Sequence, residues 1–420
     1  MSDESADIIV ISDDIRGATG FGTNARLVCW ALSENWDVVN VCPQAGSKTS
    51  TTVRGREIDI YPSETRSRTV NDYDFARENL QETIDVLEPD VVVSLVDLAM
   101  VDYLRELKKP VEASVQLRRP GQDVDVDGVV EGFRETLESQ NLDREFIWIA
   151  QFPVDGTQPP ESWKTVLADI DRPIAMSEFG QGVVEMSLGM DIPSIPHAVE
   201  ADEVYDGETG DFIVGSVNTN QWRKRHPRML EAWAMFYESV GRPDDVKFYL
   251  HADRQADVGW NLTRFLREYN LQDAMMPYQG KVSKEMLNRL YAQFDVFTSA
   301  TAGEGFGLTA VEAMYQKTPA VITDYTTTHE LVEKGEPSPR GHPIDIETTY
   351  MAHPKFGNTR RALVNVEEMA DALIDYYRNR KKLERHSENA HQWVDENLDW
   401  NDLAHQWQAM MAQTMAAIHG

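Results

Sequence analysis

The hydrophobic positions in the first half of the chain fall into short continuous runs, separated by segments with helical periodicity. Continuous apolar strands that alternate with helices are typical of parallel sheets covered on both faces. This half therefore predicts a doubly wound α/β domain. Its strands are expected at residues 7–12, 37–42, 90–95, 146–152 and 173–177, and its helices at 23–35, 76–87 and 161–170.

The second half repeats this alternation and predicts a second doubly wound domain. After about residue 365 the pattern is helical only, and the stretches 122–145 and 335–362 are expected to be loops or insertions. The strands of this half are expected at 211–217, 246–252, 274–280, 295–300 and 319–324, and its helices at 227–239, 261–270, 284–294 and 308–316.

The segment 195–210, which is rich in proline, glycine and acidic residues, predicts the join between the two domains. A chain of 420 residues is long enough for two domains with full-sized cores. We expect one domain over residues 1–198, a second over 199–398, and a terminal helix over 399–420.

The charge of the chain limits its partners. There are 70 acidic and 40 basic residues, a net charge of −30. Such a surface repels nucleic acid and anionic lipid at ordinary salt, so a nucleic-acid partner is disfavoured. The same composition is typical of proteins that work in molar salt, where the Debye length falls to ~3 Å. We therefore expect a halophilic, haloarchaeal protein, for which the argument against nucleic acid is weaker.

The N-terminus and the two cysteines bear on the compartment. The first residues are acidic and precede no long apolar run, so no secretory signal is expected. No apolar stretch approaches the ~20 residues that span a bilayer. Cys29 and Cys42 lie in apolar segments, which indicates buried thiols in a reducing compartment. We expect a cytoplasmic protein, and membrane association through its substrate stays open.

The segment 299–324 is the most informative part of the chain. It predicts a strand that ends near Ala300, a glycine-rich turn, and a helix that begins near Leu308. Glycines let the backbone approach a ligand closely, and a helix N-terminus attracts anions such as a diphosphate. Glu312 lies about one turn into the helix, where it can accept hydrogen bonds from sugar hydroxyls. Glu304 lies before the turn, where a transferred sugar would lie.

This segment resembles the E-x7-E signature of the family 4 retaining glycosyltransferases, with Glu304 and Glu312 as the two acids. The segment 195–200 resembles the interdomain segment of that family. Residues 280–300 resemble its strand, base-contacting turn, helix and strand. Trp400 precedes a helix that resembles the terminal helix. The resemblance implies the GT-B fold, with two Rossmann-like domains facing a cleft and the terminal helix crossing back to the N-terminal domain.

The resemblance also implies roles for the site residues. Glu304 would orient the sugar or stabilise its positive charge, and Glu312 would hold the nucleotide ribose. The turn near Val282 would meet the base. The remaining donor contacts implied are those of Gly305, Phe306, Gly307, Leu308 and Thr309.

A basic cluster follows the first strand of the second domain and comprises Arg223, Lys224, Arg225 and Arg228. Cations there could bind the donor diphosphate and stabilise the departing nucleotide. Members of the family usually have an arginine followed by a lysine in this loop. Lys224 matches the lysine, but Thr219 occupies the place of the arginine, and we expect Arg223 to replace it. The alternative is a solvated basic helix N-terminus.

The first domain offers weaker candidates. Gly20 and Gly22 open a helix after the first strand, where their backbone would approach the donor diphosphate or the acceptor, unless they form only a tight turn. Family members often carry a histidine near the reacting sugar. This chain has none there, so Asp155 is the catalytic candidate for that position, with Asp97 as another. His197 is expected to be structural.

No metal or cofactor is expected. Asp123, Asp125, Asp127 and Gly128 imitate the start of a calcium loop, but Arg134 occupies the twelfth position, where such a loop needs glutamate. Enzymes of the GT-B class do not need a bound metal, because cations and a helix dipole support the leaving group.

The expected function is the transfer of a sugar, with retention, from a nucleotide-diphosphate sugar to a surface glycan or lipid carrier. DNA or a virion component stays open as the acceptor, as does the choice between UDP- and GDP-sugars. A glycan phosphorylase would need a pyridoxal-binding lysine and a longer chain. A non-catalytic protein that binds nucleotide sugars is the remaining alternative.

Overall fold

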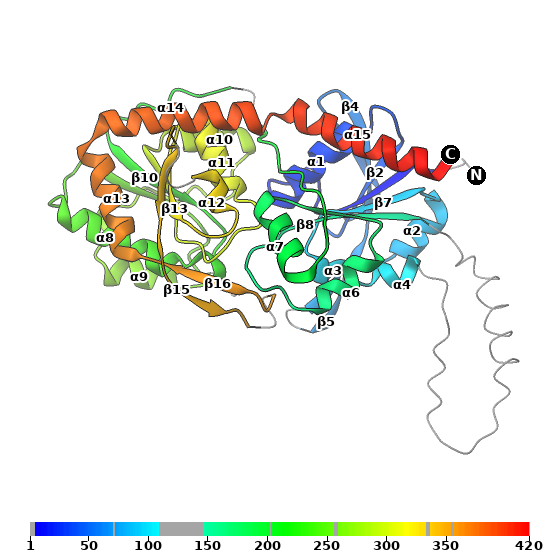
Figure 1. Ribbon diagram of the computed structural model, residues 1–420. Coiled ribbons are helices and arrows are strands. Elements are labelled where there is room, and N and C mark those ends of the chain that lie inside the picture. The colour runs from blue at the N-terminus through cyan, green and yellow to red at the C-terminus, as the bar shows by residue number, and fades with distance from the viewer. Residues whose placement is uncertain are drawn as a thin grey trace, which may run out of the picture. The chain divides into compact units, whose positions relative to one another are not determined.

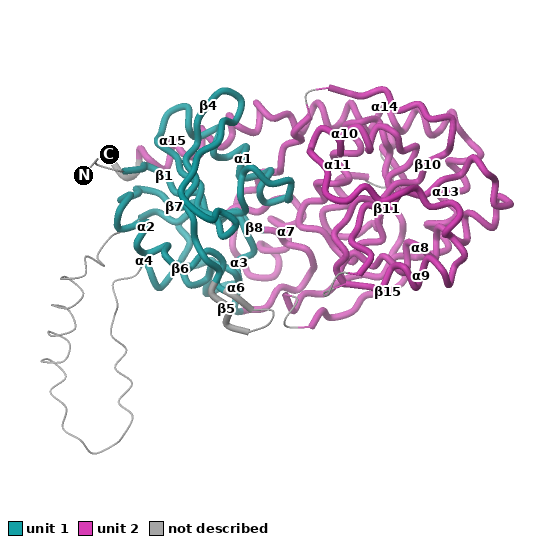
Figure 2. Tube along the Cα trace, turned by 180° about the vertical axis from the view of Figure 1, so that it is seen from behind, with its two compact units in different colours: residues 1–152, 162–173 teal, residues 153–161, 174–420 magenta. Residues whose placement is uncertain are grey.

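The structure is a computed structural model that describes residues 5–69, 72–108, 146–201, 203–255, 259–332, 337–353 and 357–419. The chain forms two compact units (Figure 2). The first comprises Met1–Phe152 and Ser162–Pro173, and the second comprises Pro153–Glu161 and Ile174–Gly420. The calcium-like segment 123–134 lies outside the described residues. The expected boundaries after residues 198 and 398 stay predictions.

The first unit is built around a seven-stranded sheet with the order β3-β4-β2-β1-β7-β8-β9 (Figure 1). Its central strands β1, β2, β7 and β8 are parallel and almost entirely buried, which explains their continuous apolar sequences. The predicted strands of this unit are confirmed. The strand bounds are β1 (Ile8–Ile11), β2 (Val38–Cys42), β3 (Thr49–Val53), β4 (Arg56–Pro62), β7 (Val91–Ser94), β8 (Ile147–Phe152) and β9 (Arg172–Ala175).

The helices that accompany these strands are α1 (Gly20–Leu32), α2 (Leu80–Leu87), α3 (Leu98–Val101), α4 (Leu104–Lys108) and α6 (Ser162–Asp169). Strands β3 to β6 were not predicted. The β3–β4 hairpin turns at Arg54 and Gly55, whose φ angles of 43° and 86° match a tight two-residue turn. A separate antiparallel pair is formed by β5 (Glu64–Thr69) and β6 (Asp72–Glu78).

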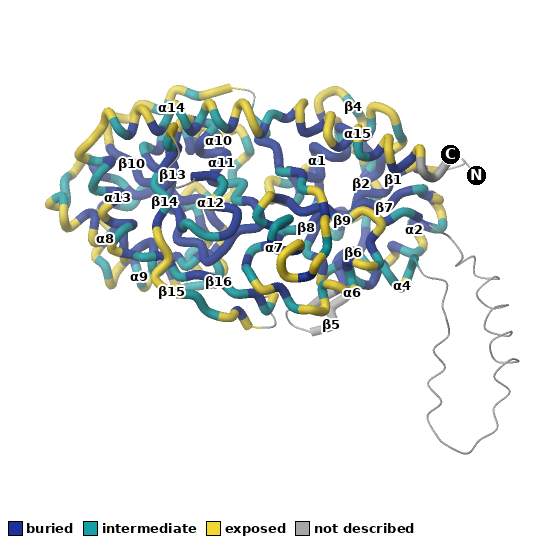
Figure 3. The backbone as a smooth tube through the Cα atoms, in the orientation of Figure 1, coloured by how far each residue is buried: buried dark blue, intermediate teal, exposed yellow. Residues whose placement is uncertain are grey.

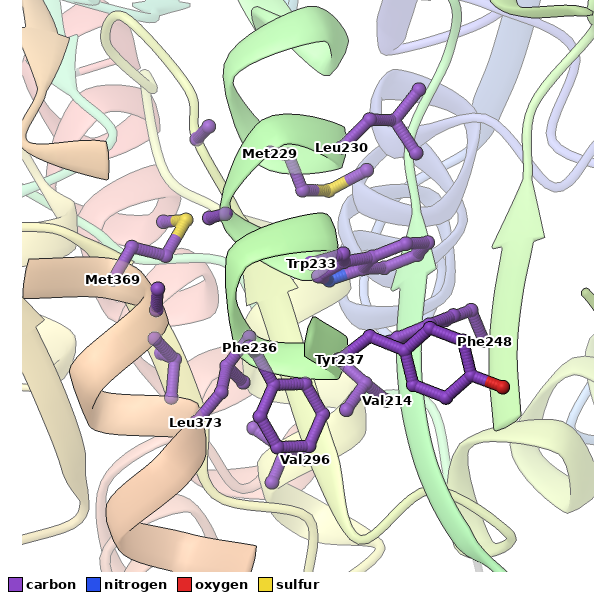
Figure 4. Packing of buried hydrophobic residues seen from close by; sticks show 14 of the residues in the cluster. Val214, Met229, Leu230, Trp233, Phe236, Tyr237, Phe248, Val296, Met369 and Leu373 are labelled. Atoms are coloured by element: carbon purple, nitrogen blue, oxygen red, sulfur yellow. The ribbon is translucent and has the colours of Figure 1, made fainter. Parts of the chain in front are cut away.

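The second unit contains a five-stranded parallel sheet with the order β11-β10-β12-β13-β14. The ring of Trp233 stacks on that of Phe248 at a centroid distance of 4.8 Å, at the centre of the hydrophobic core (Figure 4). Most residues of these strands are buried, as the dark blue of β10 and β13 in Figure 3 shows. Their bounds are β10 (Phe212–Val217), β11 (Val246–His251), β12 (Val296–Ser299), β13 (Ala320–Thr323) and β14 (Gly341–Ile344).

Helices α7 (Glu178–Leu188), α8 (His226–Ser239), α9 (Leu262–Glu268), α10 (Lys284–Ala292), α11 (Leu308–Tyr315) and α12 (Thr328–Leu331) connect the elements of this unit. Short 3₁₀ turns lie at η1 (Trp222–Lys224) and η2 (Gln272–Ala274). The helical C-terminal region is confirmed as α13 (Val366–Arg378), α14 (Arg380–Asn397) and α15 (Trp400–His419).

Two sequence predictions for this unit are wrong. Residues 274–280 form no strand, and Met275 makes only an isolated bridge to Phe248. Pro277 lacks the backbone N–H that a ladder needs. The stretch 335–362, expected to be irregular, contains β14 and the antiparallel hairpin of β15 (Ile346–Met351) and β16 (Arg360–Val364).

Candidate functional site

The turn between β12 and α11 has the geometry predicted for the glycine-rich motif. Gly307 precedes the helix with a φ of 99°, a left-handed conformation that favours glycine. A Cβ atom at Gly303 would lie 2.1 Å from the carbonyl oxygen of Asp155, and one at Gly305 would lie 2.2 Å from Cβ of Pro153. The glycines therefore let the segment that carries Asp155 pack directly on the motif.

Glu304 is buried within a set of short hydrogen bonds. Arg223 Nη1 donates to Oε2 at 2.6 Å, and Lys224 Nζ donates to Oε1 at 2.6 Å. The backbone N–H of Glu304 donates to Thr326 Oγ1 at 2.9 Å. Burial raises the pKa of Glu304, but the charges of Arg223 and Lys224 outweigh that effect and lower it to about 2. Glu304 is therefore an ionised carboxylate whose position is set by its hydrogen bonds.

Arg223 and Lys224 lie on η1, directly after β10, which neighbours β12 in the sheet. Arg223 Nη1 also donates to the carbonyl of Gly303 at 2.5 Å, and the N–H of Ala302 donates to the carbonyl of Arg223 at 2.8 Å. Burial lowers the pKa of Lys224, although the charge of Glu304 opposes that shift. The predicted pair of cations and the predicted acid are thus joined at the carboxyl ends of adjacent strands.

The other two members of the basic cluster contact the β15–β16 hairpin. The Arg225 guanidinium lies 4.6 Å from the ring centroid of Tyr350. Arg228 donates to the carbonyl of Val364 and pairs with Glu347. These contacts separate Arg225 and Arg228 from the pair that binds Glu304.

Asp155 joins the same site through an arginine that the sequence did not identify. Arg361 Nη2 donates to both carboxylate oxygens of Asp155 at 2.8 Å, and Arg223 Nε lies 3.5 Å from Oδ2. Arg361 belongs to β16, in a stretch without a clear periodic pattern. No local signal in the sequence indicated that this residue would reach the motif.

Glu312 is buried on α11 and is held by two side chains of α10. Lys284 Nζ donates to its Oε1, and the Tyr291 hydroxyl donates to its Oε2 at 3.0 Å. Burial and the nearby Glu312 charge raise the pKa of Tyr291. Neither Lys284 nor Tyr291 was predicted as a site residue. Val282 directly precedes Ser283, the residue that caps α10.

The remaining candidates are placed as follows. Phe306 packs against His197 with a ring-centroid distance of 4.9 Å, and burial lowers the pKa of His197 to about 3. Leu308 and Thr309 form the first turn of α11. The candidates of the first unit are Gly20 and Gly22, which open α1, and Asp97, which precedes α3. Their expected donor contacts stay predictions.

Among the residues that the structure describes, no group of three histidine, cysteine or acidic side chains could hold a metal ion. None of the helices in the described ranges is both long enough and apolar enough to cross a membrane.

Comparisons with known proteins agree with this geometry. Residues 190–379 match the family described as glycosyl transferases group 1. A serotype-specific mannosyltransferase, WbdA of Escherichia coli, is 30% identical over 121 residues, which are 28% of this chain and 14% of that protein. The chain thus matches only 14% of the length of this curated relative.

Two solved structures share the whole fold. Sucrose-phosphate synthase from Thermosynechococcus elongatus aligns with a TM-score of 0.68 and 16% identity, over 98% of this chain and 99% of the other. Anabaena HepE, solved with UDP and glucose, aligns with a TM-score of 0.61 and 14% identity, over 98% and 99%. The chain therefore has the GT-B fold, and its residues 190–379 are similar to the group 1 glycosyl transferases.

Proposed function

We propose that this protein transfers a sugar, with retention at the anomeric carbon, from a nucleotide-diphosphate sugar to a glycan or lipid-linked acceptor. The observation that carries the proposal is the buried carboxylate of Glu304, held ionised between Arg223 and Lys224 beside the N-terminus of α11. A fixed negative charge suits a sugar that develops positive charge as its bond to the diphosphate breaks.

The same side chains support the leaving group. Arg223, Lys224 and the N-terminal N–H groups of α11 attract the donor diphosphate and stabilise the charge that develops on it. The nucleotide diphosphate leaves with the bonding electrons, and the acceptor oxygen attacks the same face of the sugar. Glu304 orients the sugar and stabilises its positive charge.

We assign Glu312 to the nucleotide ribose. Its two oxygens accept from Lys284 and Tyr291, and a carboxylate has about four lone-pair sites, so acceptor capacity remains for sugar hydroxyls. Glu312→Gln should weaken the binding of UDP or GDP by about tenfold, because a hydrogen bond to a charged group is lost. Binding of the corresponding 2′,3′-dideoxynucleotides should change little. Titration calorimetry measures the dissociation constants of the four nucleotides, which are UDP, GDP and their 2′,3′-dideoxy forms.

Glu285→Gln is the matched control, because Glu285 lies on α10 and pairs with the exposed Arg289. This variant should bind all four nucleotides like the wild type. An equal loss for the ribo- and dideoxynucleotides in Glu312→Gln contradicts the ribose assignment.

Sugar transfer is tested with a panel of UDP- and GDP-sugars that includes GDP-mannose and UDP-glucose. GDP-mannose is included because one relative is named as a mannosyltransferase, and UDP-glucose is included because HepE was solved with it. We expect slow release of nucleotide from one donor even without acceptor, and an NMR spectrum of the first product should show the anomeric configuration of the donor. A protein that binds a nucleotide sugar but never turns it over, with any glycan, lipid or DNA acceptor, is a binding protein instead.

A further inference from the structure

Arg361 forms a short ion pair with Asp155. Its side chain is buried on β16, and its Nη2 lies 2.8 Å from each oxygen of Asp155. The position of β16 is fixed by backbone hydrogen bonds on both sides. Arg360 and Thr157 exchange N–H···O bonds of 3.0 and 2.7 Å, and the N–H of Ala362 donates to the carbonyl of Ala302 at 3.0 Å.

Asp155 also faces Arg223, whose Nε lies 3.5 Å from Oδ2. The site thus places three cations, Arg223, Lys224 and Arg361, around the carboxylates of Glu304 and Asp155. If Arg361 did not pair with Asp155, both carboxylates would draw on the charges of Arg223 and Lys224. The site would then have no net positive charge for a diphosphate.

We propose that Arg361 is a positioning residue that neutralises Asp155 and so leaves the charge of Arg223 to the donor diphosphate. Arg223 can then take the place of the arginine expected at Thr219, because Arg361 supplies from a different strand the charge that pairs with Asp155. Asp155 is then an anchor for two arginines and does not take part in the chemical step. The inference rests on the proposed function.

The test is a double-mutant cycle with Arg361→Met and Asp155→Asn, in which titration calorimetry measures the dissociation constants of UDP and GDP. Arg361→Met should weaken binding of the preferred nucleotide by about tenfold, because the interaction between two neighbouring buried charges usually has an effect of this size. Asp155→Asn should bind at least as tightly as the wild type. The double variant should return to within about threefold of the wild type, because the charge that Arg361 neutralises is gone.

The matched control is Arg360→Met. Arg360 precedes Arg361 on β16, but its side chain donates to Gln158 and Thr349. This variant removes the same charge from the same strand and should leave the dissociation constants unchanged. Thermal unfolding of each variant reports separately on the fold.

Several results overturn the inference. Unchanged binding in Arg361→Met shows that its charge is not needed, and a double variant as weak as Arg361→Met indicates direct contact with the donor. If Arg361→Met does not fold, the Asp155→Asn variant alone tests the inference. Weaker nucleotide binding in that variant, or a loss of donor hydrolysis at unchanged KM, contradicts the anchoring role of Asp155. A wild type that neither binds UDP or GDP nor hydrolyses any donor overturns the proposed function itself, and the inference with it.

Discussion

Glu304→Gln is expected to lower the turnover of the donor by about 100- to 1000-fold while the binding of UDP or GDP stays as tight or becomes tighter. The amide keeps the shape of the side chain but removes the charge that would face the developing positive sugar. It also releases Arg223 and Lys224 from their ion pairs with Oε2 and Oε1, so both cations become more available to the diphosphate. Steady-state donor hydrolysis and titration calorimetry measure the two effects.

The pH dependence of the rate gives a second check on Glu304. Its pKa is lowered to about 2, so it stays ionised over the pH range in which donor turnover is assayed. An acid limb above about pH 4 in the rate profile must therefore come from another group and should persist in Glu304→Gln. Glu330→Gln, a change at a partly buried acid on α12, is the control and should keep normal turnover. Normal turnover in Glu304→Gln contradicts the assignment of the catalytic carboxylate.

The elements that support Glu304 could be predicted because their signals are local. β10 is a continuous apolar run, β12 is a short buried run, and the sequence from Glu304 to Leu308 combines a turn with a helix start. The pairing of Glu304 with Arg223 and Lys224 could not be predicted from local signals alone. It required the sheet order, which places the ends of β10 and β12 side by side.

The rest of the site depends on contacts between residues far apart in the sequence. Arg361 is 206 positions from Asp155, and its strand pairs with β15 in a stretch that lacks regular apolar periodicity. Lys284 reaches Glu312 because α10 and α11 pack together, a contact that neither helix encodes alone. For the segment 274–280 the local signal was misleading. Its apolar residues suggested a strand, but Pro277 lacks the N–H that a strand ladder needs.

Lys224→Met is expected to lower the free energy of unfolding by about 3 kcal/mol, because it leaves the buried carboxylate of Glu304 with Arg223 as its remaining cation. It should also weaken the binding of UDP or GDP by about tenfold or more, because a cation of the diphosphate site is lost. Urea unfolding and calorimetry measure the two losses. Lys317→Met is the matched control, because it removes the same charge from an exposed pair with Glu388 and should cost less than about 1 kcal/mol.

The sign of the pH effect identifies Glu304 as the origin of this instability. In the wild type its pKa is lowered from 4.5 to about 2, so the pairing stabilises the fold fully above 4.5 and is lost as the pH falls toward 2. Without Lys224, Arg223 is left to counter the effect of burial, which raises the pKa of Glu304. The variant therefore lacks most of the stabilisation that the ionised carboxylate gives to the wild type. The difference in unfolding free energy between the wild type and Lys224→Met should therefore be largest near about pH 7 and should shrink below about pH 4. A difference that stays constant over this range means that Lys224 stabilises the fold through packing and that its charge does not hold Glu304 in place.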